Sequence, residues 1–119
     1  MFLDDLPRVI YLHRDPVDFR KQINGLSVLV EAEMMLNPFD NSLFVFTNRR
    51  RSMVRVLYWD RNGFCLWQKR LEQDRFTWPQ GDDFAPSIQM TERQLRWLLE
   101  GFNPWDRYAH KPLKYLAVS

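Results

Sequence analysis

The stretch that decides the fold is residues 54–71, which read VRVLYWDRNGFCLWQKRL. Two runs rich in aromatic and β-branched residues, Met53 to Trp59 and Phe64 to Leu71, are typical of strands. Between them stands Asp60-Arg61-Asn62-Gly63, and Asn-Gly tolerates the positive φ angles that tight hairpin turns require. The sequence therefore predicts a β-hairpin that is both aromatic and basic.

The hairpin is expected to bring cations together. If Asn62-Gly63 is a two-residue turn, Arg55 lies opposite Arg70, whereas a bulged three-residue loop places Arg55 opposite Lys69. Like charges directly opposite each other destabilise a sheet, so we expect this face to be well solvated or supplied with an anion such as phosphate.

The segments around the hairpin predict further strands and two helices. The predicted strands are Arg8 to His13, Leu43 to Phe46 and Ile88 to Met90. The first predicted helix has Asp15 as its N-cap and Pro16 as its first residue, and runs to about Met35. The second is marked by a capping box of Thr91 and Gln94 and by a stop at Gly101.

These elements predict an α+β fold, with a mainly antiparallel sheet of four to five strands and two amphipathic helices packed on one face. A chain of 119 residues is the usual size of a single domain, with a core over about residues 8–102. The C-terminal tail, residues 103–119, is expected to be partly ordered.

Charge is distributed unevenly along the chain. The net charge is only +2, but residues 48–75 hold eight basic and three acidic residues, which gives +5 there and −3 elsewhere. The run Arg49-Arg50-Arg51 falls in a predicted loop, where three adjacent guanidinium groups produce a concentrated positive potential. This pattern indicates a surface that faces anions.

Several classes of protein are disfavoured by composition. Cys65 is the single cysteine, so no internal disulfide forms, and with His13 and His110 it lacks the spacing of a zinc site. We therefore expect no metal and no cofactor. The chain shows no signal sequence and no apolar run of membrane-spanning length, so a cytoplasmic location without a membrane partner is expected.

Catalysis is not expected either. A metal-dependent nuclease needs carboxylates that converge on one ion, and the acids within the basic segment are Asp60, Glu72 and Asp74. Asp60 lies at the turn and Glu72 at the far end of the same hairpin, roughly 30 Å away along an extended strand.

A family resemblance covers about Arg8 to Gly101. It is carried by Arg8-Val9-Ile10-Tyr11-Leu12, Leu43-Phe44-Val45-Phe46-Thr47-Asn48-Arg49-Arg50-Arg51, Val56-Leu57-Tyr58-Trp59-Asp60, Gly63-Phe64-Cys65-Leu66-Trp67 and Phe76-Thr77-Trp78-Pro79. These strings resemble the accessory proteins of TnpB type, encoded by the second reading frame of insertion-sequence-66 transposons, and not the RNA-guided nuclease of the same name. Gln22 and Gln68 depart from the family pattern, which often has Gly and Tyr there.

The resemblance implies a bacterial, non-catalytic accessory role in DNA transposition, beside a separate transposase that performs the recombination chemistry. From the basic segment we expect DNA at the transposon ends to be contacted by Arg49, Arg50, Arg51, Arg55, Lys69 and Arg70. The alternative is an adaptor that docks on the transposase through exposed aromatic residues such as Trp67 and Trp78, without binding DNA. Strand aromatics also commonly fill a core, which is the competing interpretation for all of them.

Overall fold

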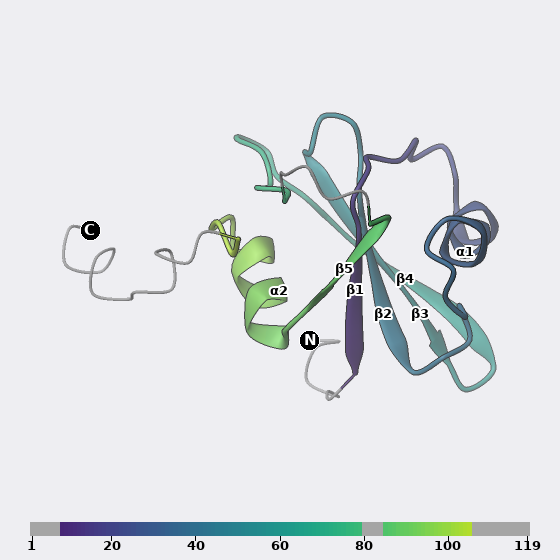
Figure 1. The fold of residues 1–119 in the computed structure, drawn as a ribbon. Coiled ribbons are helices and arrows are strands. Elements are labelled where there is room, and N and C mark those ends of the chain that lie inside the picture. Colours follow the sequence, from purple (N-terminus) through teal and green to yellow (C-terminus); the bar gives the residue numbers. More distant parts are fainter. Residues whose placement is uncertain (1–7, 80–84, 106–119) are drawn as a thin grey trace.

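The computed structural model describes residues 8–79 and 85–105, which form one five-stranded mixed sheet with a helix on each side (Figure 1). In chain order the elements are β1 (Val9–His13), α1 (Ile23–Ala32), β2 (Ser42–Thr47), β3 (Met53–Asp60), β4 (Gly63–Arg70), β5 (Ser87–Met90) and α2 (Glu92–Leu99). The strand order across the sheet is β4-β3-β2-β1-β5. The predicted α+β class and strand number are confirmed.

One strand pair is parallel, and the rest of the sheet is antiparallel. β1 and β2 run side by side in the same direction, because the connection through α1 crosses over one face of the sheet. β2, β3 and β4 follow as an antiparallel meander, and β5 pairs antiparallel with β1 at the other edge. The C-terminal ends of β1, β2 and β4 therefore meet at the same end of the sheet as the β2–β3 loop.

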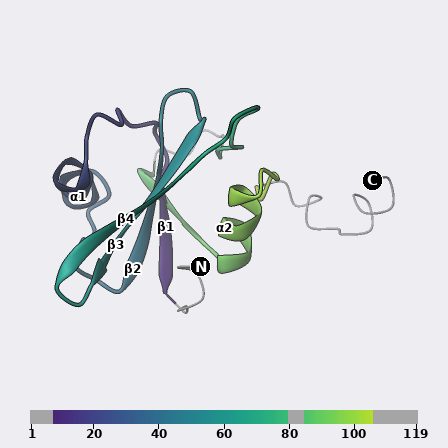
Figure 2. The ribbon, with the colours of Figure 1, turned by 180° about the vertical axis from the view of Figure 1, so that it is seen from behind.

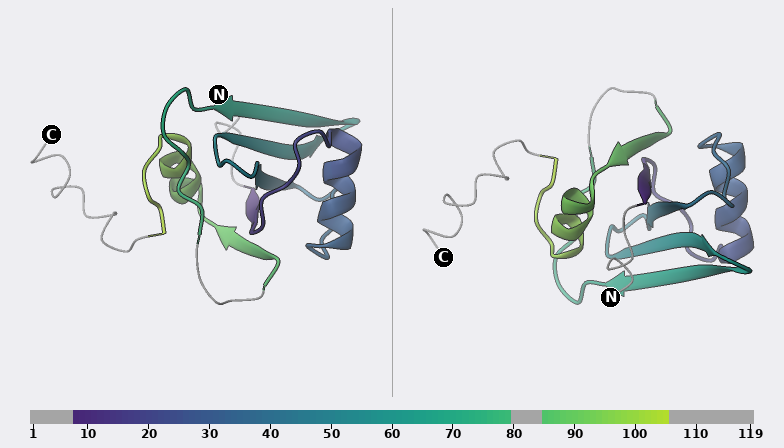
Figure 3. Two further views of the ribbon diagram at one scale, coloured as in Figure 1. Left: turned by 90° about the horizontal axis from the view of Figure 1, so that it is seen from above. Right: turned by 90° about the horizontal axis from the view of Figure 1, so that it is seen from below.

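The two helices lie on opposite faces of the sheet, so the prediction that they share one face is wrong (Figures 2 and 3). The cause lies in β2, which is buried along its whole length. Its Phe44 and Phe46 pack with α1, and its Leu43 and Val45 pack with α2. A central strand that is apolar on both faces needs a cover on each side.

The hairpin register differs from both predicted ones. Asp60 pairs with Gly63 across the turn residues Arg61 and Asn62, and the positive φ of 56° belongs to Arg61. This register places Arg55 opposite Gln68, so the predicted pairing of Arg55 with Arg70 or Lys69 is wrong. A neutral hydrogen-bond partner thus replaces the expected like-charge pair.

The first helix begins later than predicted, at Ile23, and the predicted N-cap Asp15 and first residue Pro16 lie outside it. Residues 14–22, here called the strap, run across the end of the sheet instead. The Val17 N–H donates to the Thr47 carbonyl oxygen at 2.8 Å, which ties the strap to β2. Contacts with distant strands have therefore overridden the local helix signals.

The second helix forms as its sequence predicts. Thr91 and Gln94 make both hydrogen bonds of the capping box, and Gly101 ends the helix with a φ of 93°. Beyond it the Trp105 indole Nε1 donates to the Thr77 carbonyl oxygen at 2.7 Å, so the beginning of the predicted tail is packed against the domain. The remainder of that tail, and residues 80–84, lie outside the described residues.

Candidate nucleic-acid interface

The loop from residues 48 to 52, here called the arginine loop, has a defined shape. Asn48 accepts hydrogen bonds at its Oδ1 from the backbone N–H groups of Ser52 and Met53, at 2.9 and 3.1 Å, and donates from Nδ2 to the Ser52 hydroxyl. Arg51 adopts a φ of 57°, which turns the chain back toward β3. One asparagine side chain therefore satisfies the loop backbone and fixes its path.

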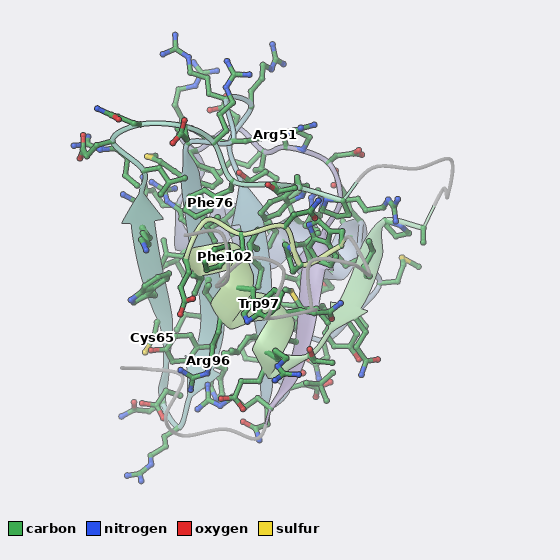
Figure 4. All side chains as sticks on the ribbon, turned by 90° about the vertical axis from the view of Figure 1, so that its left-hand side faces the viewer. Arg51, Cys65, Phe76, Arg96, Trp97 and Phe102 are labelled. Carbon is green, nitrogen blue, oxygen red and sulfur yellow. The ribbon has the colours of Figure 1, made fainter. Side chains whose placement is uncertain are left out.

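The three arginines of the arginine loop differ in their exposure to solvent. Arg49 and Arg50 are exposed, whereas Arg51 is half-buried, and its carbonyl oxygen accepts from the Phe76 N–H at 2.8 Å. Figure 4 shows Arg51 at one end of the sheet, close to where the chain passes Phe76. The segment after β4 thus supports the loop from behind and leaves Arg49 and Arg50 facing solvent.

A groove of about 560 Å³ separates the arginine loop from the strap. Its lining residues are Pro16, Val17, Asp18, Phe19 and Arg20 from the strap, and Asn48, Arg49 and Arg50 from the loop. Within it, the Arg20 guanidinium donates to the Asp18 carboxylate through both Nε and Nη2, the shorter contact being 2.6 Å. These bonds and one from the Arg20 backbone N–H lower the pKa of Asp18 to about 2.

Positive charge gathers at this end of the sheet, which we call the basic end and define as residues 14–21, 48–52 and 70–75. These segments carry eight basic residues and four acidic ones. Two of the acids, Asp18 and Glu72, are held by arginines of the same segments, Arg20 and Arg70. Arg49 and Arg50 are exposed and adjacent, and together with the exposed Lys21 and Arg75 they give this end a positive potential toward an approaching anion.

Arg55, which the sequence places among the DNA-contacting residues, lies inside the protein and is only 8% exposed. Its Nε donates to the Gln68 Oε1 at 2.6 Å, and its Nη1 donates to the carbonyl oxygens of Phe19 and Lys21 at 3.0 and 2.9 Å. Burial lowers the pKa of this guanidinium, which still stays charged in any ordinary buffer. Arg55 therefore fastens the strap to the sheet and does not reach the surface.

The other two predicted DNA-contacting cations of β4, Lys69 and Arg70, lie in different surroundings. The Lys69 ammonium donates to the Leu99 carbonyl oxygen at 2.7 Å, where it caps the C-terminal end of α2. Arg70 is exposed at the basic end and pairs with Glu72 at 3.0 Å. Of the six predicted cations, the structure brings Arg49, Arg50, Arg51 and Arg70 to one end of the sheet and directs Arg55 and Lys69 inward.

Neither of the two aromatic residues predicted to dock on the transposase, Trp78 and Trp67, is exposed. Trp78 is 2% exposed and donates from Nε1 to the His13 carbonyl oxygen, so the prediction that it is exposed is wrong. Trp67 is half-buried against the α2 side of the core. For these strand aromatics the core interpretation is the better one.

A different aromatic group, which the sequence did not predict, lies at the end of the sheet opposite the basic end. Phe39, which is 54% exposed, meets Trp59 edge-on with ring centres 5.0 Å apart. Phe64 completes a triangle with both, at 5.3 and 5.0 Å. The signal that identifies this group is an aromatic residue, Phe39, placed within the turn-rich break that precedes β2.

The acids proposed for a nuclease are not brought together. Asp60 lies at the β3–β4 turn, whereas Glu72 and Asp74 follow β4 at the basic end. Among residues 8–79 and 85–105, no group of three His, Cys, Asp or Glu side chains is arranged to hold a metal ion. In the same part of the chain, no helix is long and apolar enough to cross a bilayer.

Comparisons with known proteins place the chain in a family. The model of the IS66 Orf2-like protein family matches residues 8–109. Two proteins of Sinorhizobium fredii (strain NBRC 101917 / NGR234), the uncharacterized proteins y4jC and y4hO, are each 35% identical to this chain, over 105 and 94 residues. The alignments cover 88% and 79% of this chain and 87% and 80% of the relatives, and no solved structure matches. The chain therefore belongs to the IS66 Orf2-like family, whose members are accessory proteins of insertion-sequence transposition.

Proposed function

We propose that this protein is a non-catalytic accessory factor that contacts DNA at the ends of its insertion sequence through Arg49 and Arg50. The observation that supports this most strongly is the pair of exposed guanidinium groups on a loop whose backbone is fixed by Asn48. Guanidinium groups form paired hydrogen bonds with phosphate oxygens, and a fixed loop loses little entropy on binding. The separate transposase supplies the cutting and joining chemistry.

The contact is proposed with the phosphate backbone. Arg49 and Arg50 line one side of the groove, and on the other side Arg20 is paired with Asp18. A phosphate at the rim of the groove would therefore meet the guanidinium groups of Arg49 and Arg50 on one side and a neutral ion pair on the other. Phosphate contacts of this kind position a protein on DNA without reading its sequence. Affinity should then fall steeply as salt rises.

The test is fluorescence anisotropy with a labelled terminal repeat of the element at about 50 mM salt and upward. The double variant Arg49→Ala/Arg50→Ala should bind at least about tenfold more weakly, and the slope of log affinity against log salt should decrease by about one per lost phosphate contact. The matched control is Arg61→Asn/Arg93→Ala, which removes two exposed arginines outside the basic end and retains a residue that tolerates the positive φ at position 61.

Two results would overturn the proposal. One is the absence of binding by the wild-type protein at the lowest salt concentration. The other is an equal loss of affinity in the Arg49/Arg50 variant and in the control, because total charge and not the arginine loop would then explain binding. Circular dichroism of each variant establishes that the fold is retained.

The adaptor function has its own supporting observation, which is the aromatic group of Phe39, Trp59 and Phe64, with Phe39 exposed and the other two rings half-buried. On this second proposal, the aromatic group packs on the transposase while the basic end faces away from it. Co-purification that survives high salt and is lost in Phe39→Ala would support it, since apolar contacts are not screened. Co-purification that disappears on adding salt would contradict it.

A further inference from the structure

The groove between the strap and the arginine loop has two walls, and the fold holds each of them in place. On the strap side, the Val17 N–H donates to the Thr47 carbonyl oxygen at 2.8 Å, and Arg55 donates to the Phe19 carbonyl oxygen at 3.0 Å. On the other side, Asn48 fixes the backbone of the arginine loop. Figure 1 shows both segments at the same end of the sheet, one before α1 and one between β2 and β3. The groove is therefore formed before any ligand enters it, as binding sites for small ligands usually are.

The size of the groove limits what it can hold. Its volume of about 560 Å³ lies within the range of roughly 300–1,000 Å³ that is typical of sites for one small molecule. A double helix, whose major groove alone is about 12 Å wide, does not fit into a space of this volume. Paired DNA can therefore touch only the rim, whereas a single nucleotide with an unpaired base can enter.

The two walls of the groove suit different parts of a nucleotide. The arginine loop contributes the exposed Arg49 and Arg50, whose guanidinium groups match the oxygens of a phosphate. The strap contributes Pro16, which is exposed, and Phe19, which is half-buried. Proteins that bind single strands combine a basic groove for the backbone with aromatic side chains that pack on the bases. The lining of this groove has both components.

The strap wall favours a base over a second phosphate. Asp18 and Arg20 form an ion pair at 2.6 Å, so together they present no net charge to a phosphate, while their polar atoms can bond to the edge of a base. The ring of Phe19 is held by the guanidinium of Arg55, 4.4 Å from the ring centre, so it loses little freedom when a base packs against it. The neutral, flat part of a nucleotide therefore fits the strap, and its charged part fits the arginine loop.

We propose that the groove binds an unpaired nucleotide at an opened or single-stranded end of the DNA, with its phosphate on Arg49 and Arg50 and its base against Pro16 and Phe19. This inference rests on the DNA contact proposed above and specifies which form of DNA the site takes. Packing of one base on an aromatic side chain strengthens single-strand binding by about fivefold or more. DNA with an unpaired end should therefore bind more tightly than paired DNA that carries the same number of phosphates.

The experiment is fluorescence anisotropy of the full chain, at one salt concentration, with three labelled DNAs of equal length. The first is a fully paired terminal repeat, the second has mismatched base pairs at its end, and the third has abasic residues at the mismatched positions. The mismatched end should bind at least about fivefold more tightly than the paired end, and the abasic end should lose this gain. Because all three DNAs carry the same phosphates, the difference isolates the contribution of the base.

Phe19→Leu should abolish the preference for the mismatched end and leave the affinity for the paired end within about twofold, whereas Phe19→Tyr, which retains the ring, should keep the preference. Tyr11→Leu is the matched control, because it removes a half-buried ring from the same α1-side cluster at a position outside the groove. Circular dichroism verifies the fold of each variant. The abasic comparison uses only the wild-type protein, so it decides the matter even if a Phe19 variant fails to fold.

Two results would overturn this inference and leave the phosphate contact standing, if Arg49→Ala/Arg50→Ala still weakens binding to every DNA. One is equal affinity of the wild-type protein for the paired and mismatched ends. The other is an abasic end that binds as tightly as the mismatched end, because the freed backbone and not the base would then explain the gain. Absence of binding to all three DNAs would instead overturn the proposed function, and this inference with it.

Discussion

The guanidinium of Arg55 lies over the ring of Phe19, 4.4 Å from the ring centre, and donates a hydrogen bond to the carbonyl oxygen of the same residue. One side chain of β3 therefore holds both the ring and the backbone of the strap. In a helix that began at Asp15, this carbonyl would accept from the N–H four residues later. Because Arg55 takes that position, the chain between Asp15 and Gln22 stays non-helical, and α1 starts at Ile23.

Arg55→Lys should destabilise the fold by about 2–3 kcal/mol, although it keeps the charge. An ammonium lacks the planar set of donors that reaches Gln68, Phe19 and Lys21 together, so buried acceptors lose their partner. Urea unfolding measures the change, with Arg61→Asn as an exposed control. At concentrations of urea where both proteins are folded, the DNA affinity of Arg55→Lys should equal that of wild type. An affinity loss there would show that Arg55 reaches DNA after all.

Lys69→Ala should lower the free energy of unfolding by about 1 kcal/mol without changing DNA affinity. The Lys69 ammonium binds the Leu99 carbonyl oxygen, one of the groups left without a helical partner at the end of α2. Thermal unfolding and anisotropy on the same sample separate the two effects. If the variant kept full stability and lost DNA affinity, the side chain would act at the surface and not as a cap.

The elements that the sequence predicted well are those whose signals are local. The capping box of Thr91 and Gln94 lies within one turn, and α2 starts there as expected. Asp15 and Pro16 offered an equally clear local signal. The outcome was decided by two hydrogen bonds to β2 and β3, in which the Thr47 carbonyl oxygen accepts from Val17 and the Arg55 guanidinium donates to Phe19, both across more than 25 residues of chain. The side on which each helix packs was equally inaccessible, because an apolar run such as β2 does not say which face meets which helix.

The candidate site was predictable only in part, for a related reason. Arg49 and Arg50 were identified by adjacency within a loop, and they are exposed. Arg55 was grouped with them because the sequence does not show whether a strand side chain points into the protein or toward solvent. Only the observed strand register reveals that Arg55 lies opposite Gln68. The role of Asn48 was missed, although a polar side chain that directly follows a strand is a common way to satisfy the N–H groups of a loop.

Asp18→Asn should strengthen DNA binding, because it frees the Arg20 guanidinium beside the groove. The folded-state pKa of Asp18, about 2, lies below the ordinary value of 3.8, so its contact with Arg20 stabilises the fold above pH 4. That contribution is lost as the pH falls from about 4 to about 2, and Asp18→Asn should be less sensitive to acid over this range. Fluorescence anisotropy at neutral pH tests the expected gain in DNA affinity, and weaker DNA binding by Asp18→Asn would contradict it. Acid unfolding, monitored by circular dichroism, tests the expected change in acid sensitivity.

Asn48→Ala should weaken DNA binding by about three- to tenfold although it removes no charge. Without the Asn48 carboxamide, the N–H groups of Ser52 and Met53 lose their acceptor, and the arginine loop must be ordered when DNA binds. The number of phosphates contacted stays the same, so the salt slope should remain at the wild-type value while the affinity falls. Ser52→Ala, which removes only the bond from Asn48 Nδ2, is the matched control and should have a smaller effect. If the slope of log affinity against log salt also decreased in Asn48→Ala, phosphate contacts would have been lost. That result would contradict the view that Asn48 acts only by ordering the loop that carries Arg49 and Arg50.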